Sequence, residues 1–149
     1  MNTPIKFELA KLLVDKGIEI KSNKRYFLNK NDEEITDEFI FEKYKGKVLN
    51  ASIDAAKSVY AISHISAPTI AEVVMWLYEK HKIWIGVELT DNTRDFYFQP
   101  KIWTSKDREY HDEDMTDQAK YISDWKEWRF NTPAESYKAA IEYCLTKII

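Results

Sequence analysis

The densest cluster of groups that could do chemistry is REYHDEDMTD, residues 108–117. It offers an imidazole and several carboxylates, which are common ligands of divalent metals. The central candidates, His111 to Asp114, are consecutive, however, and neighbouring side chains cannot easily converge on one ion. The alternating ligands and the turn glycine of a calcium-binding loop are missing as well. We therefore interpret the stretch as a solvated acidic loop and expect neither a metal nor another cofactor.

Nucleophilic chemistry has two candidate sites, and neither has the surroundings it needs. A serine beside His64, in the segment SHIS, would require an oxyanion hole, which a glycine-rich elbow usually provides. The chain has three glycines, too few for that elbow or for a phosphate-binding glycine loop. Cys144 falls on an apolar helical stripe, which favours a buried core thiol. An enzyme is thus the less favoured class, and a small hydrolase assembled from distant residues remains a third alternative.

Basic and aromatic residues occur together in KSNKRYFLNK, residues 21–30. Single-stranded nucleic acid is held in this way, by phosphate contacts and by base stacking. Four residues would form such a site on a tight hairpin with SNKR at its turn: Lys21, Lys24, Arg25 and Tyr26. A solvated hairpin tip is the favoured interpretation of this segment. The net charge of −3 weighs against nucleic acid as the main partner.

Aromatic residues make up 14% of the chain. IWIGVELT and DFYFQ alternate as two paired strands joined by the turn DNTR. One sheet face then carries apolar residues directed at the core: Ile83, Ile85, Val87, Leu89, Phe96 and Phe98. The other face carries aromatic and polar residues: Trp84, Glu88, Tyr97, Gln99 and either Trp125 or Trp128. Such a mixture is typical of a protein interface, unless residues 1–66 cover this face and make it core.

Two helices flank these strands. Residues 69–81 form a helix that begins with a capping box of Thr69 and Glu72. The final nineteen residues form a second helix, with Thr132 as its cap and Pro133 in its first turn. The stripe of this helix that faces the core consists of Tyr137, Ala140, Ile141, Cys144, Leu145 and Ile148.

The remaining elements complete a single domain over residues 1–149. Pro100 should interrupt the second strand, at an edge or a bend. A polar loop at 105–117 and a third strand at 121–130 give residues 67–149 an α-β-β-β-α order. Residues 1–66 add a layer made of a helix, the hairpin, a short helix capped by Thr36 and the helical segment NASIDAAKSVYAIS. The predicted fold class is α+β, with an antiparallel sheet flanked by helices.

Three segments, FELAKLLVDKG, APTIAEVVMWLYEKHKIWI and NTPAESYKAAIEYCLTKII, resemble stretches of small uncharacterised proteins of gut Bacteroidetes and their phages and prophages. The resemblance covers the first helix and most of residues 67–149. It implies a genetic setting and no catalytic residue. Small phage accessory proteins often act by binding a host or phage component.

The function expected from the sequence is that of a phage or prophage accessory protein that binds another protein, or itself as a homodimer. Nucleic-acid binding is the alternative. The first residues lack the basic start and apolar run of a secretory signal, and the chain has no apolar stretch long enough to span a membrane. We therefore expect the protein in the cytoplasm of a bacterial host, with no membrane partner.

Overall fold

The computed structural model divides the chain into two compact units. Unit 1 combines Met1–Ile5 with Thr69–Ile149, and unit 2 is Lys6–Pro68. Both contain helices and antiparallel strands, which confirms the α+β class. None of the helices in the described part of the chain is long and apolar enough to cross a membrane. The packing of the whole chain as one domain stays a prediction. The structure describes residues 1–45, 53–92, 95–104 and 129–149.

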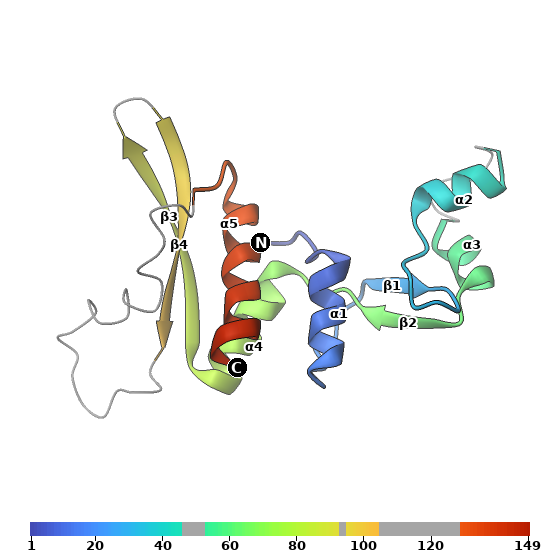
Figure 1. Ribbon diagram of the computed structural model, residues 1–149, viewed down its shortest axis with the longest axis horizontal. Helices are drawn as coiled ribbons and strands as arrows, with labels where there is room; N and C mark the ends of the chain where they lie inside the picture. The colour runs from blue at the N-terminus through green and yellow to red at the C-terminus, as the bar shows by residue number, and fades with distance from the viewer. Residues whose placement is uncertain (46–52, 93–94, 105–128) are drawn as a thin grey trace. The chain divides into compact units, whose positions relative to one another are not determined.

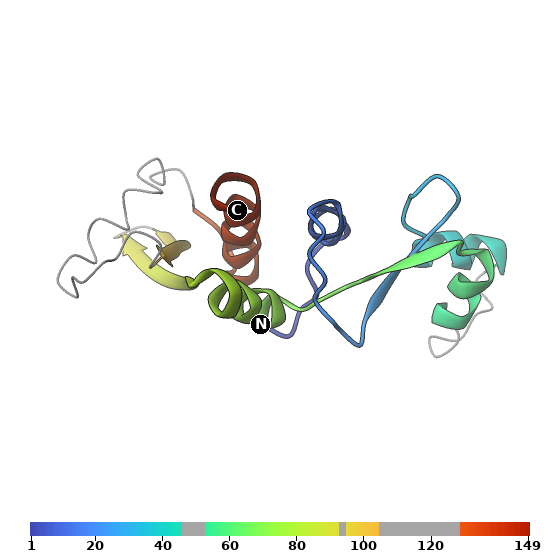
Figure 2. The same cartoon turned by 90° about the horizontal axis from the view of Figure 1, so that it is seen from below.

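In unit 1, two helices cover one face of a long hairpin (Figures 1 and 2). The hairpin pairs β3 (Ile83–Asn92) antiparallel with β4 (Asp95–Thr104). α4 (Ile70–His81) packs on β3, and α5 (Pro133–Tyr143) packs on both strands and on α4. The helices therefore form one layer and the hairpin forms the other.

The core of unit 1 lies between these layers. It is built from one face of each element: Ile70, Val73, Val74, Leu77, Ile83, Ile85, Ile102, Ala140, Ile141, Cys144 and Leu145. The stripe predicted for the final helix is confirmed from Ala140 to Leu145, whereas Tyr137 and Ile148 at its ends are half-buried. The last part of this stripe lies on a π-helical turn, Cys144–Ile148, that continues α5.

Side-chain caps define where the two helices begin. The hydroxyl of Thr69 accepts a hydrogen bond from the backbone N–H of Glu72 at 3.2 Å, and the Glu72 carboxylate accepts one from the Thr69 N–H at 2.7 Å. This reciprocal pair confirms the predicted capping box. Thr132 caps α5 by accepting from the backbone N–H of Glu135 at 3.2 Å.

The apolar face of the hairpin is buried only where the helices cover it. Ile83 is 1% exposed, whereas Leu89 is 53% and Phe96 is 71% exposed. Figure 1 shows the far ends of β3 and β4 extending beyond α5. The prediction that Leu89 and Phe96 face the core is therefore wrong, because neither α4 nor α5 covers them. Val87 and Phe98, which lie between the two ends, are half-buried.

β4 runs through Pro100 without a break, contrary to the expectation that this residue interrupts the strand. Two backbone hydrogen bonds, of 2.8 and 3.1 Å, join Phe98 to Phe130 on the edge of β4 that faces away from β3. Residues two apart on a strand direct their backbone groups the same way. The N–H that proline lacks would thus lie on this outer edge, where no bond to β3 is lost. Phe130 is the last residue of the predicted third strand. Residues 121–128 of that strand and the predicted loop at 105–117 lie outside the described residues.

Unit 2 is built on two strands from distant parts of the sequence. β1 (Arg25–Leu28) pairs antiparallel with β2 (Ser63–Ser66). α1 (Phe7–Asp15) packs on β2, and α2 (Asp37–Lys43) packs on α3 (Ile53–Tyr60). Both short helices lie in segments predicted to be helical.

The hairpin predicted around residues 21–30 is wrong, because β1 takes β2 as its partner. Residues 22–24 instead form a loop tied to the chain after β2, and Arg25 begins β1. The Ser22 hydroxyl donates to the Ala67 carbonyl at 3.3 Å, and the Ala67 N–H donates to the Lys24 carbonyl at 2.9 Å. The cap predicted at Thr36 is confirmed by its 3.2 Å hydrogen bond from a backbone N–H.

Cys144 offers a test of the core of unit 1. The thiol is fully buried, and this burial raises its pKa from an ordinary value near 9 to about 12. A raised folded-state pKa gives stability that is present below pH 9 and is lost as the pH rises toward 12, because the unfolded thiol ionises first. At neutral pH, Cys144→Ala should cost about 1 kcal/mol through a small cavity.

We therefore expect urea unfolding of wild type and Cys144→Ala to give a stability difference that shrinks above pH 9. Ionisation of tyrosine and lysine side chains occurs in both proteins and cancels in this comparison. A pH-independent difference, or rapid modification of the native thiol by a thiol reagent, would contradict burial of Cys144.

Candidate functional site

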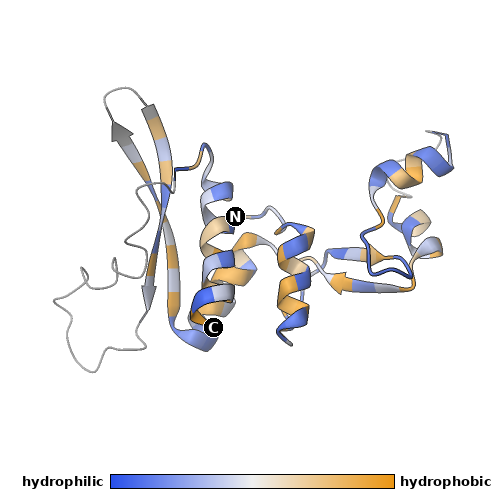
Figure 3. Ribbon diagram, in the orientation of Figure 1, coloured by the Kyte–Doolittle hydropathy of each residue, from blue (hydrophilic) through white to orange (hydrophobic). Residues whose placement is uncertain are grey.

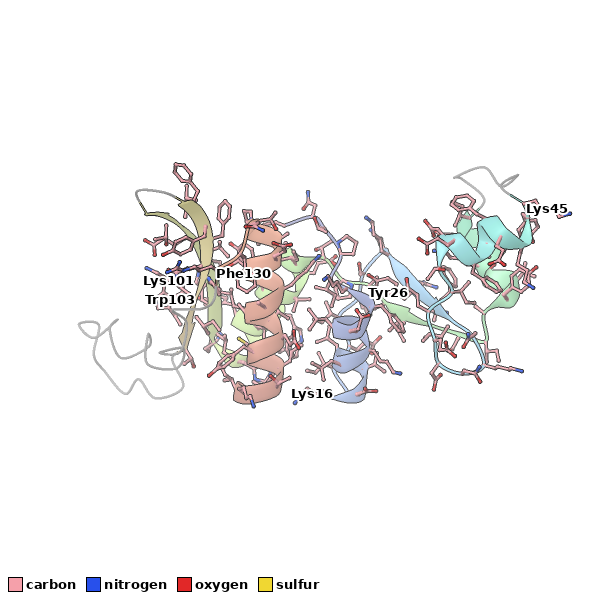
Figure 4. All side chains as sticks on the ribbon, turned by 45° about the horizontal axis from the view of Figure 1, so that its top comes forward. Lys16, Tyr26, Lys45, Lys101, Trp103 and Phe130 are labelled. Carbon is pink, nitrogen blue, oxygen red and sulfur yellow. The ribbon has the colours of Figure 1, made fainter. Side chains whose placement is uncertain are left out.

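The face of the β3–β4 hairpin that points away from α4 and α5 is the candidate binding surface, and we call it the aromatic face. Hydrophobic and more polar residues alternate along much of both strands (Figure 3), and residues paired across the ladder share a face. The pairs on the aromatic face are Trp84 with Trp103, Gly86 with Lys101, Glu88 with Gln99, and Thr90 with Tyr97. Figure 4 shows Lys101 and Trp103 on the side of the hairpin away from α5.

On this face Trp84 is exposed, Tyr97 and Trp103 are half-buried, and each ring contacts a neighbouring residue. Trp84 is 44% exposed, and the ring of Tyr78 from α4 meets it edge to face with a centroid separation of 5.7 Å. The Arg129 guanidinium lies 4.7 Å from the ring centroid of Tyr97, a cation–π distance. Between these aromatic groups, Glu88 and Lys101 form an ion pair.

Gly86 gives the ring of Trp103 its place on the sheet. A Cβ atom at residue 86 would lie 2.8 Å from Cζ3 and 3.1 Å from Cη2 of Trp103. The indole therefore lies directly over the glycine backbone, at a distance that no other residue type allows without movement. The glycine thus lets a large ring approach the sheet closely, where it widens the aromatic surface beside Trp84.

Alternation brings four of the predicted binding residues together on this face: Trp84, Glu88, Tyr97 and Gln99. Trp125 and Trp128 lie outside the described residues. Sequence reasoning missed Lys101, Trp103 and Arg129. The first two continue the period-two pattern of Tyr97 and Gln99 beyond Pro100, where the sequence predicts an interruption of the strand.

The four residues of the predicted nucleic-acid site separate in the structure. Lys21 and Arg25 line a pocket of about 630 Å³ in unit 2, together with His64. Arg25 Nη1 lies 3.2 Å from His64 Nε2, so the imidazole can accept a hydrogen bond in its Nδ1-protonated form. Lys24 is exposed and does not line the pocket.

Tyr26, the ring expected to stack on bases, lies on the other face of β1. Its ring packs edge to face with the ring of Phe7 of α1, and the two ring centroids are 5.5 Å apart. Figure 4 shows Tyr26 between β1 and α1. Burial, followed by the nearby carboxylates of Glu34 and Glu8, raises the pKa of the phenol. The ring is therefore part of the packing between β1 and α1.

Among the described residues, those considered for catalysis are not assembled into a site. Ser66, near His64, donates its hydroxyl proton to the Ile20 carbonyl at 2.6 Å. The imidazole of His81 packs on the ring of Trp76, with the two ring centroids 4.9 Å apart. Within the described ranges, no three His, Cys, Asp or Glu side chains are grouped to hold a metal. The candidate ligands at 111–114 lie outside those ranges.

Comparisons of the chain with protein-family models, with curated proteins and with solved structures find no match. The aromatic face of unit 1 and the pocket of unit 2 are the features of the described residues that bear on function.

The contact between Gly86 and Trp103 can be tested with a double-mutant cycle. Replacing glycine by alanine within a strand ordinarily stabilises it by about 0.5–1 kcal/mol. In a Trp103→Ala background, Gly86→Ala should show this gain. In wild type the displaced indole should cancel or reverse the gain, and the near-UV circular dichroism should change. Equal effects of Gly86→Ala in both backgrounds would contradict the close contact.

Proposed function

We propose that the protein works by protein–protein binding through its aromatic face, and that its partner there is a second copy of the chain. The supporting observation is the difference between the two faces of one hairpin. Ile83 and Ile85 are each 1% exposed beneath the helices, whereas Trp84, the residue between them, is 44% exposed. A large aromatic side chain thus lies open on a rigid strand.

The composition of the face favours binding over simple solvation. Tryptophan, tyrosine and arginine are enriched among residues that dominate binding energy, and Trp84, Trp103, Tyr97 and Arg129 supply all three types. Trp103 lies on Gly86 and Arg129 lies over Tyr97, so these side chains are held by neighbours before any partner arrives. Less conformational entropy is then lost on association.

The charges of the face favour a second copy as the partner. Glu88 and Lys101 carry opposite charges on neighbouring strands. A two-fold axis through the face could set the Glu88 of each copy against the Lys101 of the other. The contacts between Glu88 and Lys101 of the two copies would then join unlike charges, which stabilises the encounter and helps to fix its orientation.

The setting proposed for this binding is a phage or prophage accessory protein in the cytoplasm of a bacterial host. It is supported by the resemblance of the segments FELAKLLVDKG, APTIAEVVMWLYEKHKIWI and NTPAESYKAAIEYCLTKII to such proteins. In that setting a homodimer could in turn bind a host or phage component. We do not propose nucleic-acid binding as the main function, because Tyr26 packs on Phe7 and is not presented for stacking.

The proposal is tested by substituting one exposed ring on each face of the hairpin. Trp84→Ala should weaken self-association by about 2 kcal/mol, as the loss of an aromatic anchor does. Phe96→Ala is the matched control, because Phe96 is 71% exposed on the opposite face. Sedimentation velocity over a concentration series measures the self-association of both variants, and thermal unfolding of each variant reports its stability.

A wild-type protein that stays monomeric at high micromolar concentration would contradict self-association. Equal weakening by the two substitutions would show that the contact does not use the aromatic face. Should Trp84→Ala instead cost roughly 3–5 kcal/mol of folding stability and leave assembly unchanged, the ring is part of a core.

A further inference from the structure

Unit 2 contains a pocket that the aromatic face does not explain. Its volume of about 630 Å³ lies within the range of small-molecule sites. The walls come from α1, the loop that follows it, and the paired strands β1 and β2. The larger aliphatic side chains of the lining are Leu13, Val14, Ile18, Ile20, Ile65 and Pro68.

Basic groups are also part of this lining. The lining contains three basic residues, Lys21, Arg25 and His64, and one acidic residue, Glu19. In the part of the chain that the structure describes, neither Lys21 nor Arg25 forms an ion pair. In its Nδ1-protonated form, His64 accepts from one of the five N–H groups of Arg25 and can orient the guanidinium, whose other donors match the geometry of a carboxylate.

The loop that carries Lys21 is fixed before any ligand binds. Ser22 donates to the Ala67 carbonyl, and Ser66 donates to the Ile20 carbonyl at 2.6 Å. These bonds tie the loop to β2 and to the residue after it, so little ordering is needed on binding. They also commit the hydroxyl protons of both serines, which leaves the basic side chains as the donors for an anion.

The walls indicate what the rest of the ligand is like. The lining contains aliphatic side chains and no Phe, Tyr or Trp ring. Tyr26 packs on Phe7 from the other face of β1. Among the described residues of the lining, the imidazole of His64 is the one aromatic ring on which a nucleobase could stack, whereas a hydrocarbon chain can be buried against leucine, isoleucine and valine.

We propose that this pocket binds a small aliphatic anion, a carboxylate carried on a hydrocarbon chain. Arg25 and Lys21 hold the carboxylate, His64 orients Arg25, and the aliphatic walls bury the chain. The site lies within unit 2 and uses none of the residues of the aromatic face. Its failure and the failure of self-association are therefore separate results.

Isothermal titration of the full chain with sodium octanoate tests this proposal. We expect saturable binding of octanoate. We expect no binding of octylammonium, which has the same chain length and the opposite charge. Arg25→Gln should weaken octanoate binding about ten-fold or more, as expected for a lost charge-assisted hydrogen bond. Lys24→Gln is the matched control: this neighbouring lysine is exposed and outside the pocket, so affinity should not change.

A second variant tests the aliphatic wall. Val14 is 49% exposed, so Val14→Asp should fold, and its carboxylate should repel octanoate and weaken binding by a similar factor. Far-UV circular dichroism confirms folding of each variant. Absence of octanoate binding, equal binding of octylammonium, or equal loss in Arg25→Gln and Lys24→Gln would overturn the proposal. Tighter binding of adenosine monophosphate than of octanoate would overturn it in favour of a nucleotide site.

Discussion

Burial of one side of the β3–β4 hairpin beneath α4 and α5 is the constraint on which the rest of unit 1 depends. Ile83, Ile85 and Ile102 are each at most 3% exposed in this layer. Because strand side chains alternate strictly, fixing these three residues inward sends Trp84 and Trp103 outward. A register slip of one residue would bury polar groups and expose the isoleucines, at a large cost in free energy. The aromatic face is thus a geometric consequence of the core on the other side.

The parts of the fold that could be predicted from sequence are those set by local chemistry. A threonine three residues before a glutamate is enough to specify the capping box of Thr69, and apolar spacing places Cys144 in the core. Alternation also gives the correct partition of the hairpin into two faces. It does not show where burial stops. Leu89 and Phe96 fit the inward pattern, but α5 does not extend over the part of the hairpin that carries them. How far one layer extends over another depends on tertiary packing, which no local pattern encodes.

Pro100 and the strands of unit 2 also show features that local sequence patterns do not determine. Whether a proline breaks a ladder depends on which edge its nitrogen faces, and that follows from register rather than from residue type. In unit 2, the partner of β1 lies far along the chain in SHIS, a four-residue segment too short for its pattern to identify it as a strand. The pocket groups Lys21 and Arg25 with His64 only because of this long-range pairing. The basic residues were visible in the sequence, but their partner and the aliphatic walls beside them were not.

The most direct measurement of binding at the aromatic face is a dilution series followed by NMR of the tryptophan indole N–H signals. Trp84 and Trp103 lie on that face, whereas Trp76 lies on α4 against His81 and serves as an internal control. Substitution of each tryptophan by phenylalanine assigns its signal. If a second copy binds as proposed, the Trp84 and Trp103 signals should shift together with concentration and the Trp76 signal should stay in place. Signals of Trp84 and Trp103 that do not move between low and high micromolar concentration would contradict it.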